Sequence, residues 1–402
     1  MSVPGSKSIT NRALIAACLS QHKVTLKNVL LSQDTQAMID CLIRLGFEIR
    51  HDKDEIRVAN NLNDIKKTDI ELDANQSGTS IRFLTALCCL IPGKQTLTGK
   101  KSLLSRPIQP LVDALSQLGA DIEISDNAIV IKSETLQPGA VYLDASLSSQ
   151  FLTSIMLIAP VVGLEINITG ELASASYIDI TKKLLNDCGV QVNRINNRVV
   201  IPEQDYLLDV YTIEADASAA CYFWALAALT GREIEVRGVE RDSLQGDMRV
   251  LDIVELYGAK VELTDRGVKV IGSSQAKSVN VDMSNCPDQI QTIAVLAAFA
   301  DGVSRIAGIE TLKHKETDRL TAIITELSKM GIDASVNNGV LSVTGGYPKS
   351  AIIDTYDDHR TAMSFALAGA KIEDMIIKNP DVVNKTFPEF WDKLAQCGVE
   401  VQ

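Results

Sequence analysis

The chain has 402 residues, and a typical domain size of roughly 150 residues therefore predicts two to three domains. Hydrophobic residues make up 46% of the chain and charged residues 22%, which is the composition of a globular protein and excludes a disordered or fibrous chain. The formal net charge is −12 and aromatic residues make up only 4%, so neither a duplex-binding nor a base-stacking nucleic-acid surface is expected.

A helical pattern that ends in glycine and runs directly into a short alternating strand occurs six times along the chain. The six glycines follow one another at intervals of 67 to 73 residues: Gly46, Gly119, Gly189, Gly258, Gly331 and Gly398. Each stands where a helix needs a residue with positive φ, so that the chain can reverse into the next strand. The spacing predicts an internal repeat of about 70 residues.

A second series of segments lies between these amphipathic helices and is apolar nearly all round. Its members are residues 12–19, 81–90, 150–159, 217–229, 290–300 and 359–370. Such segments predict helices that are buried on every side. Strands are predicted at 24–29, 128–133, 198–202, 268–272 and 340–345. Each repeat therefore contains one buried helix, one amphipathic helix and several strands.

Six repeats are too many for one core, because single cores stop growing at about 250 to 300 residues. We expect two lobes of three repeats each, residues 4–212 and residues 213–402, with the boundary midway between the third and fourth repeats. No stretch rich in Gly, Ser or Pro marks this junction. A tight hinge is therefore favoured over a flexible tether.

Each buried helix is entered through a short polar segment, at 4–12, 75–80, 146–150, 214–218, 285–289 and 356–360. Ser, Asn and Asp are expected there as helix caps. Lys7, Arg12, Arg82 and Arg360 exceed that expectation, because the helix dipole disfavours a cation at a helix start by about 0.3 to 1 kcal/mol. Helix N-termini combined with cations form a site for an anion. Gly78 would let the backbone approach such a ligand closely.

One further segment and one further residue carry charges that could belong to a functional site. Residues 314–320 hold two cations and two acids, and on a helix Lys315 and Arg319 would share a face, with Glu316 about a quarter-turn away. An ordinary charged surface helix is the alternative. Asp288 follows a Cys-Pro pair at a buried helix start, where its spacing is that of a cap more than of a catalytic base.

The eight cysteines include no CxxC pair and no Cys/His spacing typical of a metal site. Most fall in apolar helical runs, where a reduced cysteine packs as a small hydrophobe, so a reducing cytoplasmic compartment is expected. The apolar run near the N-terminus is interrupted by Asn11 and Arg12 and does not have the pattern of a signal peptide. The most apolar stretches, such as 219–230, are about a dozen residues long and too short to span a bilayer.

Eight motifs together resemble the 5-enolpyruvylshikimate-3-phosphate (EPSP) synthase family, the 3-phosphoshikimate 1-carboxyvinyltransferases. They are PGSKSITNRAL (4–14), SGTSIRFL (77–84), SRPIQPLVDAL (105–115), SSQFLTSIM (148–156), SLQGDMR (243–249), KETDRL (315–320), DDHRTAM (357–363) and NKTFPEF (384–390). The resemblance covers essentially the whole chain. It implies an α/β (α+β) fold of two lobes, each an inside-out barrel of three repeats, with residues 1–3 joining the C-terminal lobe and an active site in the cleft between the lobes.

The family transfers the enolpyruvyl group of phosphoenolpyruvate to the 5-hydroxyl of shikimate 3-phosphate and releases phosphate, on the way to chorismate and the aromatic amino acids, without a cofactor or metal. The resemblance implies the following contacts to shikimate 3-phosphate: Lys7, Ser8, Arg12, Ser148, Ser149, Gln150, Ser174, Tyr177, Asp288 and Lys315. For phosphoenolpyruvate it implies Lys7, Gly78, Arg106, Gln150, Arg319, Arg360 and Lys385.

In this reaction the acceptor hydroxyl must lose a proton while the methylene carbon of the donor gains one. Asp288 resembles the base that serves the hydroxyl, and Glu316 resembles the carboxyl associated with the proton at carbon. Lys7 would stabilise the departing phosphate. The division of acid and base roles among Asp288, Glu316 and Lys385 stays open. The resemblance further implies a cytoplasmic monomer that acts on two small molecules, with neither a nucleic acid nor a membrane as partner.

The sequence departs from the family pattern at several places. Gln76 stands where the family usually has Asn, and Thr311 stands where several members have an Asn that contacts shikimate. Members carry a strand or more ahead of PGSKS, whereas residues 1–3 alone precede it here. Two alternatives follow: the sixth repeat is completed differently, or the sequence is truncated and the protein less stable. Gly78 implies sensitivity to phosphonate analogues such as glyphosate, and Phe83, in place of a common proline, would shift that sensitivity.

Three alternatives remain from the sequence. UDP-N-acetylglucosamine 1-carboxyvinyltransferases share the architecture and the donor, but they normally carry a reactive cysteine in a loop whose counterpart here, 99–109, has none. RNA 3′-terminal phosphate cyclases have related repeats, although the acidic charge and few aromatic residues oppose nucleic acid. A non-catalytic protein of this fold would bind shikimate 3-phosphate without releasing phosphate.

Overall fold

The computed structural model describes residues 1–66, 68–133, 135–172, 174–240 and 242–402. The chain divides into two compact units, one of residues 5–213 and one of residues 1–4 together with 214–402. The chain passes from one unit to the other after residue 4 and again after residue 213. Each of these positions lies one residue later than the bounds 4–212 and 213–402 expected from the sequence.

Three helices form the interior of the unit 5–213. They are α1 (Lys7–Leu19), α3 (Gly78–Cys88) and α6 (Ser149–Val162), and nearly all of their residues are buried. Each is followed by an amphipathic helix with a single buried face: α2 (Gln33–Leu45), α5 (Gln109–Gln117) and α7 (Ser176–Asp187). A short α4 (Lys101–Leu104) and a 3₁₀ turn η1 (Leu62–Asp64) complete the described helical segments.

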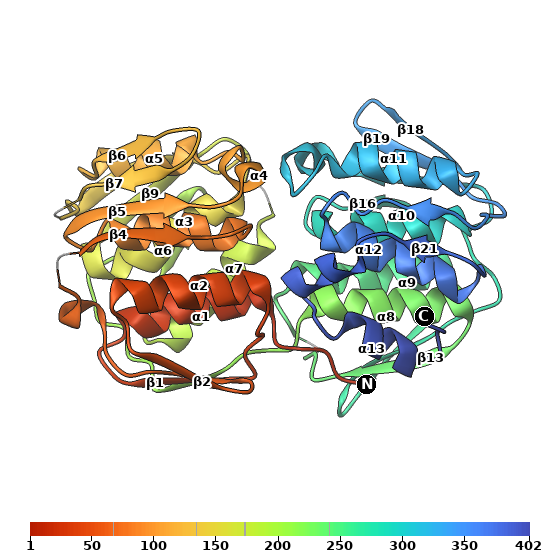
Figure 1. Ribbon diagram of the computed structural model, residues 1–402, viewed down its shortest axis with the longest axis horizontal. Helices are drawn as coiled ribbons and strands as arrows, with labels where there is room; N and C mark the ends of the chain where they lie inside the picture. The colour runs from red at the N-terminus through yellow and green to blue at the C-terminus, as the bar shows by residue number, and fades with distance from the viewer. Residues whose placement is uncertain (67, 134, 173, 241) are drawn as a thin grey trace. The chain divides into compact units, whose positions relative to one another are not determined.

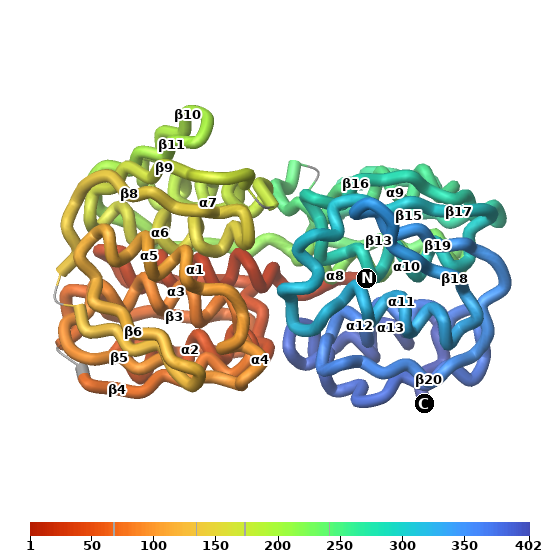
Figure 2. The backbone as a smooth tube through the Cα atoms, turned by 90° about the horizontal axis from the view of Figure 1, so that it is seen from above, coloured from red at the N-terminus to blue at the C-terminus, as the bar shows by residue number. Residues whose placement is uncertain are grey.

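Four-stranded sheets cover these helices on the outside of the unit (Figures 1 and 2). Their orders are β12-β1-β3-β2, β4-β5-β7-β6 and β10-β11-β9-β8. In each sheet one pair is parallel, β1 with β12, β4 with β5 and β8 with β9, and the remaining pairs are antiparallel. The strands are β1 (Val24–Lys27), β2 (Ile49–Asp52), β3 (Glu55–Val58), β4 (Thr68–Asp73), β5 (Gly93–Thr98), β6 (Ile122–Ile124), β7 (Ile129–Ile131), β8 (Gly139–Asp144), β9 (Leu164–Thr169), β10 (Asn193–Ile195), β11 (Arg198–Ile201) and β12 (Val210–Thr212).

The second unit repeats this plan around another set of buried helices. These are α8 (Ala217–Thr230), α10 (Ile290–Ala298) and α12 (His359–Ala366), the last continued by η5 (Leu367–Ala370). Its amphipathic helices are α9 (Val250–Tyr257), α11 (Arg319–Lys329) and α13 (Phe390–Gln396). The 3₁₀ segments are η2 (Gly246–Arg249), η3 (Pro287–Gln289), η4 (Glu310–His314) and η6 (Pro380–Lys385).

The sheets of this unit differ in size. Their orders are β13-β15-β14, β16-β17-β19-β18 and the parallel pair β20-β21. The strands are β13 (Glu233–Arg237), β14 (Lys260–Thr264), β15 (Gly267–Ile271), β16 (Asn280–Asp282), β17 (Val303–Ala307), β18 (Asp333–Asn337), β19 (Val340–Thr344), β20 (Ile352–Ile353) and β21 (Ile376–Ile377).

The first residues of the chain extend the sheet that begins with β13. Ser2 forms a parallel bridge with Arg237. The amino group of Met1 donates to the carbonyl of Glu235 at 2.7 Å, and the amide of Arg237 donates to the carbonyl of Met1 at 2.8 Å. These hydrogen bonds occupy the outer edge of β13, which would otherwise expose its backbone groups.

The six glycines of the predicted repeat all have positive φ, between 76° and 125°. They follow the six amphipathic helices, and a strand or extended segment comes next. The repeat and its glycine-terminated helices are therefore confirmed. The five predicted strand segments are also confirmed, because each overlaps a strand of the structure, namely β1, β7, β11, β15 and β19.

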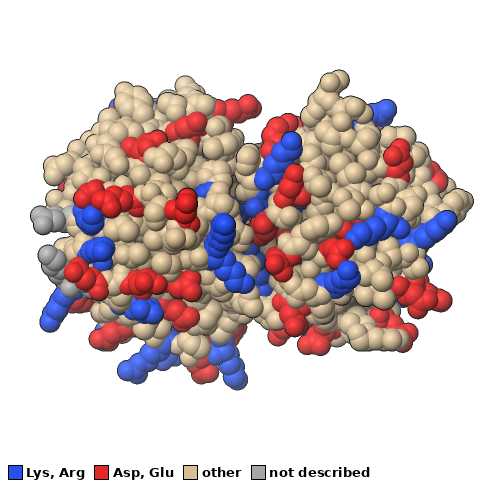
Figure 3. Space-filling view, turned by 45° about the horizontal axis from the view of Figure 1, so that its top comes forward, with Lys and Arg blue, Asp and Glu red and all other residues tan. Residues whose placement is uncertain are grey.

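All eight cysteines are free thiols, and seven are buried. Burial raises their pKa, for example to about 12 for Cys89 and Cys188, so these thiols are neutral and pack as hydrophobes. None of the described helices is both long and apolar enough to cross a membrane. On the face drawn in Figure 3, acidic and basic side chains are interspersed over each unit rather than segregated by sign.

Candidate active site

The unit 5–213 carries a fixed positive charge at the start of α1. The Nζ atom of Lys7 lies 3.0 Å from Oδ2 of Asp34, a buried residue in the first turn of α2. Ser6, the N-cap residue of α1, makes no side-chain cap bond within the described residues. An anion that arrives at this helix start would therefore meet backbone N–H groups and an ammonium held in place by Asp34.

Arg12 lies one turn along α1, below this helix start, and is buried. Its guanidinium donates to the carbonyl of Ser8 at 2.7 Å, to Oγ1 of Thr181 at 2.9 Å and to the carbonyl of Tyr177 at 3.4 Å. It also lies over the rings of Phe83 and Tyr177. Burial lowers the pKa of Arg12 to about 10, against a smaller opposing effect of Tyr177. These contacts assign Arg12 to holding Ser8 and α7 in place, while its direct contact with a substrate stays a prediction.

A second polar group forms where α3 and α6 begin. Arg82 of α3 donates to Oε1 of Gln150 at 2.6 Å and to the carbonyl of Pro107 at 2.8 Å. A Cβ atom on Gly78 would lie only 2.9 Å from Nη1 of Arg106 and 3.1 Å from Nη1 of Arg82. Arg82 thus ties α6 and the loop before α5 to α3, and three residues predicted to bind phosphoenolpyruvate, Gly78, Arg106 and Gln150, converge there.

Three serines predicted to contact shikimate 3-phosphate lie at the ends of helices of the same unit. Ser148 is the N-cap of α6, and its Oγ accepts a hydrogen bond from the amide of Gln150 at 3.3 Å. Ser149 is the first residue of α6 and is buried. Ser174 has a left-handed φ of 51°, and its carbonyl accepts from the amide of Tyr177 at 3.2 Å. A serine at the start of a helix can serve as a cap without binding a ligand. The contacts of these three serines with shikimate 3-phosphate therefore stay predictions.

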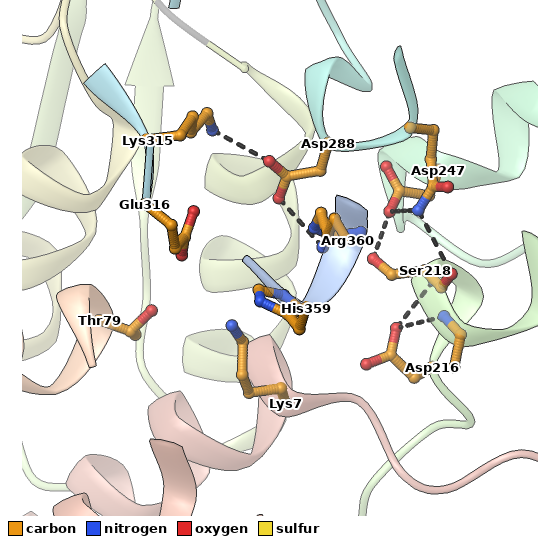
Figure 4. Close-up of polar contacts among 12 residues, drawn as sticks. Lys7, Thr79, Asp216, Ser218, Asp247, Asp288, Lys315, Glu316, His359 and Arg360 are labelled. Carbon is orange, nitrogen blue, oxygen red and sulfur yellow. Dashed lines mark hydrogen bonds and ion pairs between the residues drawn. The ribbon is translucent and has the colours of Figure 1, made fainter. Parts of the chain in front are cut away.

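In the other unit, Asp288 is surrounded by three cations, and Figure 4 shows two of them, Lys315 and Arg360. Its Oδ1 atom lies 3.1 Å from Nζ of Lys315 and 2.9 Å from Nη1 of Arg319, and its Oδ2 atom lies 3.2 Å from Nη2 of Arg360. The side chain is 20% exposed, so the carboxylate is within reach of a ligand. Asp288 lies in η3, just before the buried helix α10.

Arg319 is the centre of this charged cluster and is itself only 1% exposed. Besides Asp288 it contacts Oε2 of Glu316 at 2.7 Å and Oδ2 of Asp358 at 2.7 Å. Glu316 in turn lies 2.9 Å from Nζ of Lys385, which is buried in η6. Cations and carboxylates therefore alternate, and each buried charge has an opposite neighbour, as burial requires.

These contacts determine the protonation of the cluster. Burial would raise the pKa of Asp288, but Arg360, Lys315 and Arg319 outweigh it and hold that pKa well below its ordinary value. Burial would likewise lower the pKa of Arg319, and Asp358, Glu316 and Asp288 raise it instead. Asp288 is therefore a carboxylate, able to accept a proton only after its cations turn to other anions.

A neighbouring polar group surrounds Asp247, in η2. Burial raises its pKa, with Arg360 acting in the opposite direction. Its carboxylate accepts from the hydroxyl of Ser218 (Figure 4) and, at 3.2 Å, from Nε2 of Gln289. This group holds together the starts of α8 and α10, and its member Gln289 directly follows Asp288 in η3.

The structure corrects the expectation for residues 314–320. The helix α11 begins at Arg319, and Lys315 is an extended residue after η4, so the two do not share a helical face. They meet because both contact Oδ1 of Asp288. The N-cap Asp318, whose Oδ1 accepts from the amide of Thr321 at 3.1 Å, sets the start of α11.

Every site residue predicted for the unit 214–402 lies in this one cluster, namely Asp288, Lys315, Glu316, Arg319, Arg360 and Lys385. The sequence did not single out Asp34, Asp247 or Asp358, which orient the predicted side chains. Asp358 was detectable as a helix cap in the DDHR motif, whereas Asp34 and Asp247 became evident only from their tertiary contacts.

No group of three or more His, Cys, Asp and Glu residues suited to a metal ion occurs in the part of the chain that the structure describes. That the reaction needs no cofactor stays a prediction.

The charge of Asp288 leads to a prediction about stability in acid. Because its pKa in the folded protein is below the value of roughly 3.9 for an unfolded aspartate, its stabilising effect is complete above about pH 5 and decreases as the pH falls through 4. The difference in unfolding free energy between wild type and Asp288→Asn, measured by urea titration, should be constant from pH 5 to 8 and shrink below pH 4. A difference that changes between pH 6 and 8 would contradict this assignment.

Comparison with known proteins identifies the class of this fold. The solved structure of EPSP synthase from Acinetobacter baumannii superimposes with a TM-score of 0.84 at 21% identity, covering 100% of this chain and 96% of that one. The enolpyruvyl transferase NikO from Streptomyces tendae gives 0.78 at 15% identity, covering 100% and 95%. The chain therefore has the enolpyruvyl transferase fold, which confirms the two-lobed α/β fold expected from the sequence.

The sequence comparisons identify the family. The family model described as EPSP synthase (3-phosphoshikimate 1-carboxyvinyltransferase) matches residues 1–394. A 3-phosphoshikimate 1-carboxyvinyltransferase of Colwellia psychrerythraea is 40% identical, with 98% of this chain and 96% of the relative covered, and one of Syntrophobacter fumaroxidans is 37% identical, with 98% and 95% covered. The chain belongs to the EPSP synthase family.

Proposed function

We propose that this protein is a transferase of the shikimate pathway, which moves the enolpyruvyl group of phosphoenolpyruvate to the 5-hydroxyl of shikimate 3-phosphate and releases phosphate. The match of the EPSP synthase family model to residues 1–394 carries this conclusion. Both substrates are polyanions, and an acidic protein can bind them only where cations are gathered locally. The cations around Asp288 and those at the starts of α1 and α3 meet that need.

The reaction forms and breaks defined bonds. The hydroxyl oxygen on C5 of shikimate 3-phosphate bonds to C2 of phosphoenolpyruvate and gives up its proton, while the methylene carbon C3 accepts a proton. The C2 centre passes through a cation-like state to a tetrahedral adduct. The bond from C2 to the phosphate oxygen then breaks, C3 loses a proton, and the enol ether and inorganic phosphate are released.

We assign the proton transfer at oxygen to Asp288. In the structure its carboxylate is neutralised by Lys315, Arg319 and Arg360. When the carboxylate and phosphate groups of the substrates bind these cations, they compete with Asp288 for the same positive charge. The pKa of Asp288 then rises from its depressed value, and the carboxylate becomes a better proton acceptor only when both substrates are present.

Glu316 and Lys7 complete the catalytic assignment. Glu316 contacts Arg319 and Lys385, which are both assigned to phosphoenolpyruvate, and we assign to Glu316 the exchange of a proton with the methylene carbon. Lys7, fixed by Asp34 at the start of α1, would stabilise the negative charge on the departing phosphate together with the helix N–H groups.

The remaining substrate contacts are distributed over both units. We assign shikimate 3-phosphate to Lys7, Ser8, Arg12, Ser148, Ser149, Gln150, Ser174, Tyr177, Asp288 and Lys315. We assign phosphoenolpyruvate to Lys7, Gly78, Arg106, Gln150, Arg319, Arg360 and Lys385. Because each substrate draws contacts from both units, we propose that the two units close on the substrates in a shared cleft, with residues 4–212 serving mainly shikimate 3-phosphate. The enzyme acts as a cytoplasmic monomer without a cofactor.

One assay tests the proposed function. The purified protein is supplied with phosphoenolpyruvate and either shikimate 3-phosphate or UDP-N-acetylglucosamine, and the release of inorganic phosphate is followed. Release that depends on shikimate 3-phosphate is expected. Release with the UDP-sugar alone would assign the chain to the other carboxyvinyl transfer, and binding of shikimate 3-phosphate without release would make it a non-catalytic binding protein.

A further inference from the structure

A fully buried carboxylate lies on α11, two helical turns beyond Arg319 and outside the predicted site. Glu326 is 0% exposed. Its two oxygens accept from Nζ of Lys329 at 2.8 Å each, from the amide of Asp354 at 3.1 Å and from the hydroxyl of Tyr356. Four hydrogen bonds from three donor groups fill its acceptor positions, so its oxygens are bonded only within the protein.

Lys329 and Lys378 extend this group toward the surface. The Nζ atom of Lys329 also lies 2.7 Å from Oδ2 of Asp354, and the Nζ atom of Lys378 lies 2.9 Å from Oδ1 of the same carboxylate. Asp354 is therefore held through its backbone by Glu326 and through its side chain by two lysines. The segment that begins at Asp354 is thus attached firmly to α11.

The held segment contains two consecutive residues in an unusual backbone conformation. Tyr356 has a φ of 53° and Asp357 a φ of 54°, in the left-handed region that non-glycine residues adopt at a cost. Such a conformation persists only where surrounding contacts impose it. Glu326 supplies such a contact through the hydroxyl of Tyr356, and Asn379 supplies another by donating to Oδ1 of Asp357 at 3.0 Å.

The next residues of the chain belong to the charged cluster. Asp358 contacts Nε of Arg319 at 2.7 Å and accepts from the amide of Arg360 at 2.9 Å. The guanidinium of Arg360 then reaches Asp288 at 3.2 Å. The left-handed turn at Tyr356 and Asp357 sets the direction in which these two side chains leave the backbone.

We propose that Glu326 is a positioning residue for the phosphoenolpyruvate site, acting through Tyr356 and the left-handed turn on Asp358 and Arg360. The chain from Glu326 to Arg360 lies wholly within one unit. This role rests on the proposed function, specifically on the assignment of Arg319 and Arg360 to phosphoenolpyruvate. Glu326 touches neither substrate in this proposal, so it affects the affinity for one substrate without supplying chemistry.

Replacing Glu326 by Gln tests the role with little change in volume. An amide has one acceptor oxygen where the carboxylate has two, and it carries no charge to pair with Lys329. Its NH2 group must replace one acceptor oxygen, so either the amide of Asp354 loses its acceptor or the hydroxyl of Tyr356 must accept instead of donate. We expect the KM for phosphoenolpyruvate to rise by about tenfold, with the KM for shikimate 3-phosphate within about twofold of wild type. Tyr356→Phe, which removes only the hydroxyl, should shift the same KM in the same direction and carries the test if Glu326→Gln fails to fold.

Two control variants separate positioning from general stability. Val343→Ala opens a cavity at a buried position of β19 in the same unit and should lower the melting temperature while leaving both KM values within about twofold. Lys260→Gln removes a surface ion pair to Glu262 on β14, outside the group around Glu326, and should also leave both KM values unchanged. The positioning role is overturned if Glu326→Gln and Tyr356→Phe leave both KM values unchanged, or if Val343→Ala produces the same selective rise.

Arg360→Lys, measured in parallel, separates a failure of the assignment of Arg360 to phosphoenolpyruvate from a failure of the positioning role of Glu326. If it leaves the KM for phosphoenolpyruvate within about twofold, the assignment of Arg360 is overturned and the positioning role falls with it. If Arg360→Lys raises that KM while the Glu326 and Tyr356 variants do not, only the positioning role is overturned. A rise in all three supports both.

Discussion

Replacing Asp288 by Asn is expected to lower kcat by about three orders of magnitude while the protein remains folded. Asparagine is nearly the same size, but its amide cannot take the proton from the acceptor hydroxyl. It also leaves Lys315, Arg319 and Arg360 without the carboxylate that all three contact. The measurement is phosphate release at saturating concentrations of both substrates, with circular dichroism to establish the fold.

A matched substitution elsewhere in the same unit controls for the loss of one negative charge. Asp333 is exposed at the start of β18, and Asp333→Asn should keep kcat within about twofold of wild type. If Asp288→Asn retains more than about a tenth of the wild-type kcat, Asp288 is not the base and serves only to hold the three cations.

The repeated architecture could be predicted from the sequence because local rules alone determine it. A helix that must reverse into a strand needs a residue with positive φ, and glycine is the residue that adopts this conformation at least cost. Gly46 and Gly258, with φ of 107° and 125°, meet that need in corresponding repeats of the two units. Buried helices are apolar nearly all round, whereas amphipathic helices have apolar residues on one face, and this difference is visible without coordinates.

The detailed geometry of the site could not be predicted, because contacts distant in sequence determine it. Lys315 and Arg319 are four residues apart, and the local pattern favoured one helix for both. Instead α11 begins at Arg319, because Asp318 caps it there, and Asp288 draws Lys315 toward Arg319 from another element. The hydrogen bond from Arg82 to Gln150 could not be predicted for the same reason, because the two residues are 68 positions apart along the chain.

The carboxylates of the cluster explain how an acidic protein can hold several cations close together. A chain with a net charge of −12 keeps four cations close together, Lys315, Arg319, Arg360 and Lys385, by placing Asp288, Glu316 and Asp358 between them. In the absence of substrate these carboxylates offset the repulsion among the cations. In the proposed function, anionic substrates would compete with the carboxylates for these cations, and substrate binding would therefore be coupled to the proton affinity of Asp288.

Replacing Gly78 by Ala is expected to raise the KM for phosphoenolpyruvate by about a hundredfold, with little change in the KM for shikimate 3-phosphate. The added Cβ would lie 2.9 Å from Nη1 of Arg106 and 3.1 Å from Nη1 of Arg82, closer than van der Waals contact permits. Arg82 cannot yield readily, because it is buried and bonded to Gln150 and Pro107. The guanidinium of Arg106 must therefore move away from the position assigned to phosphoenolpyruvate.

The same substitution should leave the fold intact, because Gly78 is the first residue of α3 and does not have a left-handed φ. Glyphosate inhibition, which the resemblance to the family implies for a glycine here, should weaken in parallel, since an inhibitor in the phosphoenolpyruvate site would lose the same guanidinium. Gly346→Ala is the matched control, because an added Cβ there meets no described atom within 4 Å, and both KM values should stay within about twofold. If Gly78→Ala binds phosphoenolpyruvate as wild type does, Arg106 does not contact that substrate. The close approach of Gly78 to the guanidinium would then be a matter of packing alone.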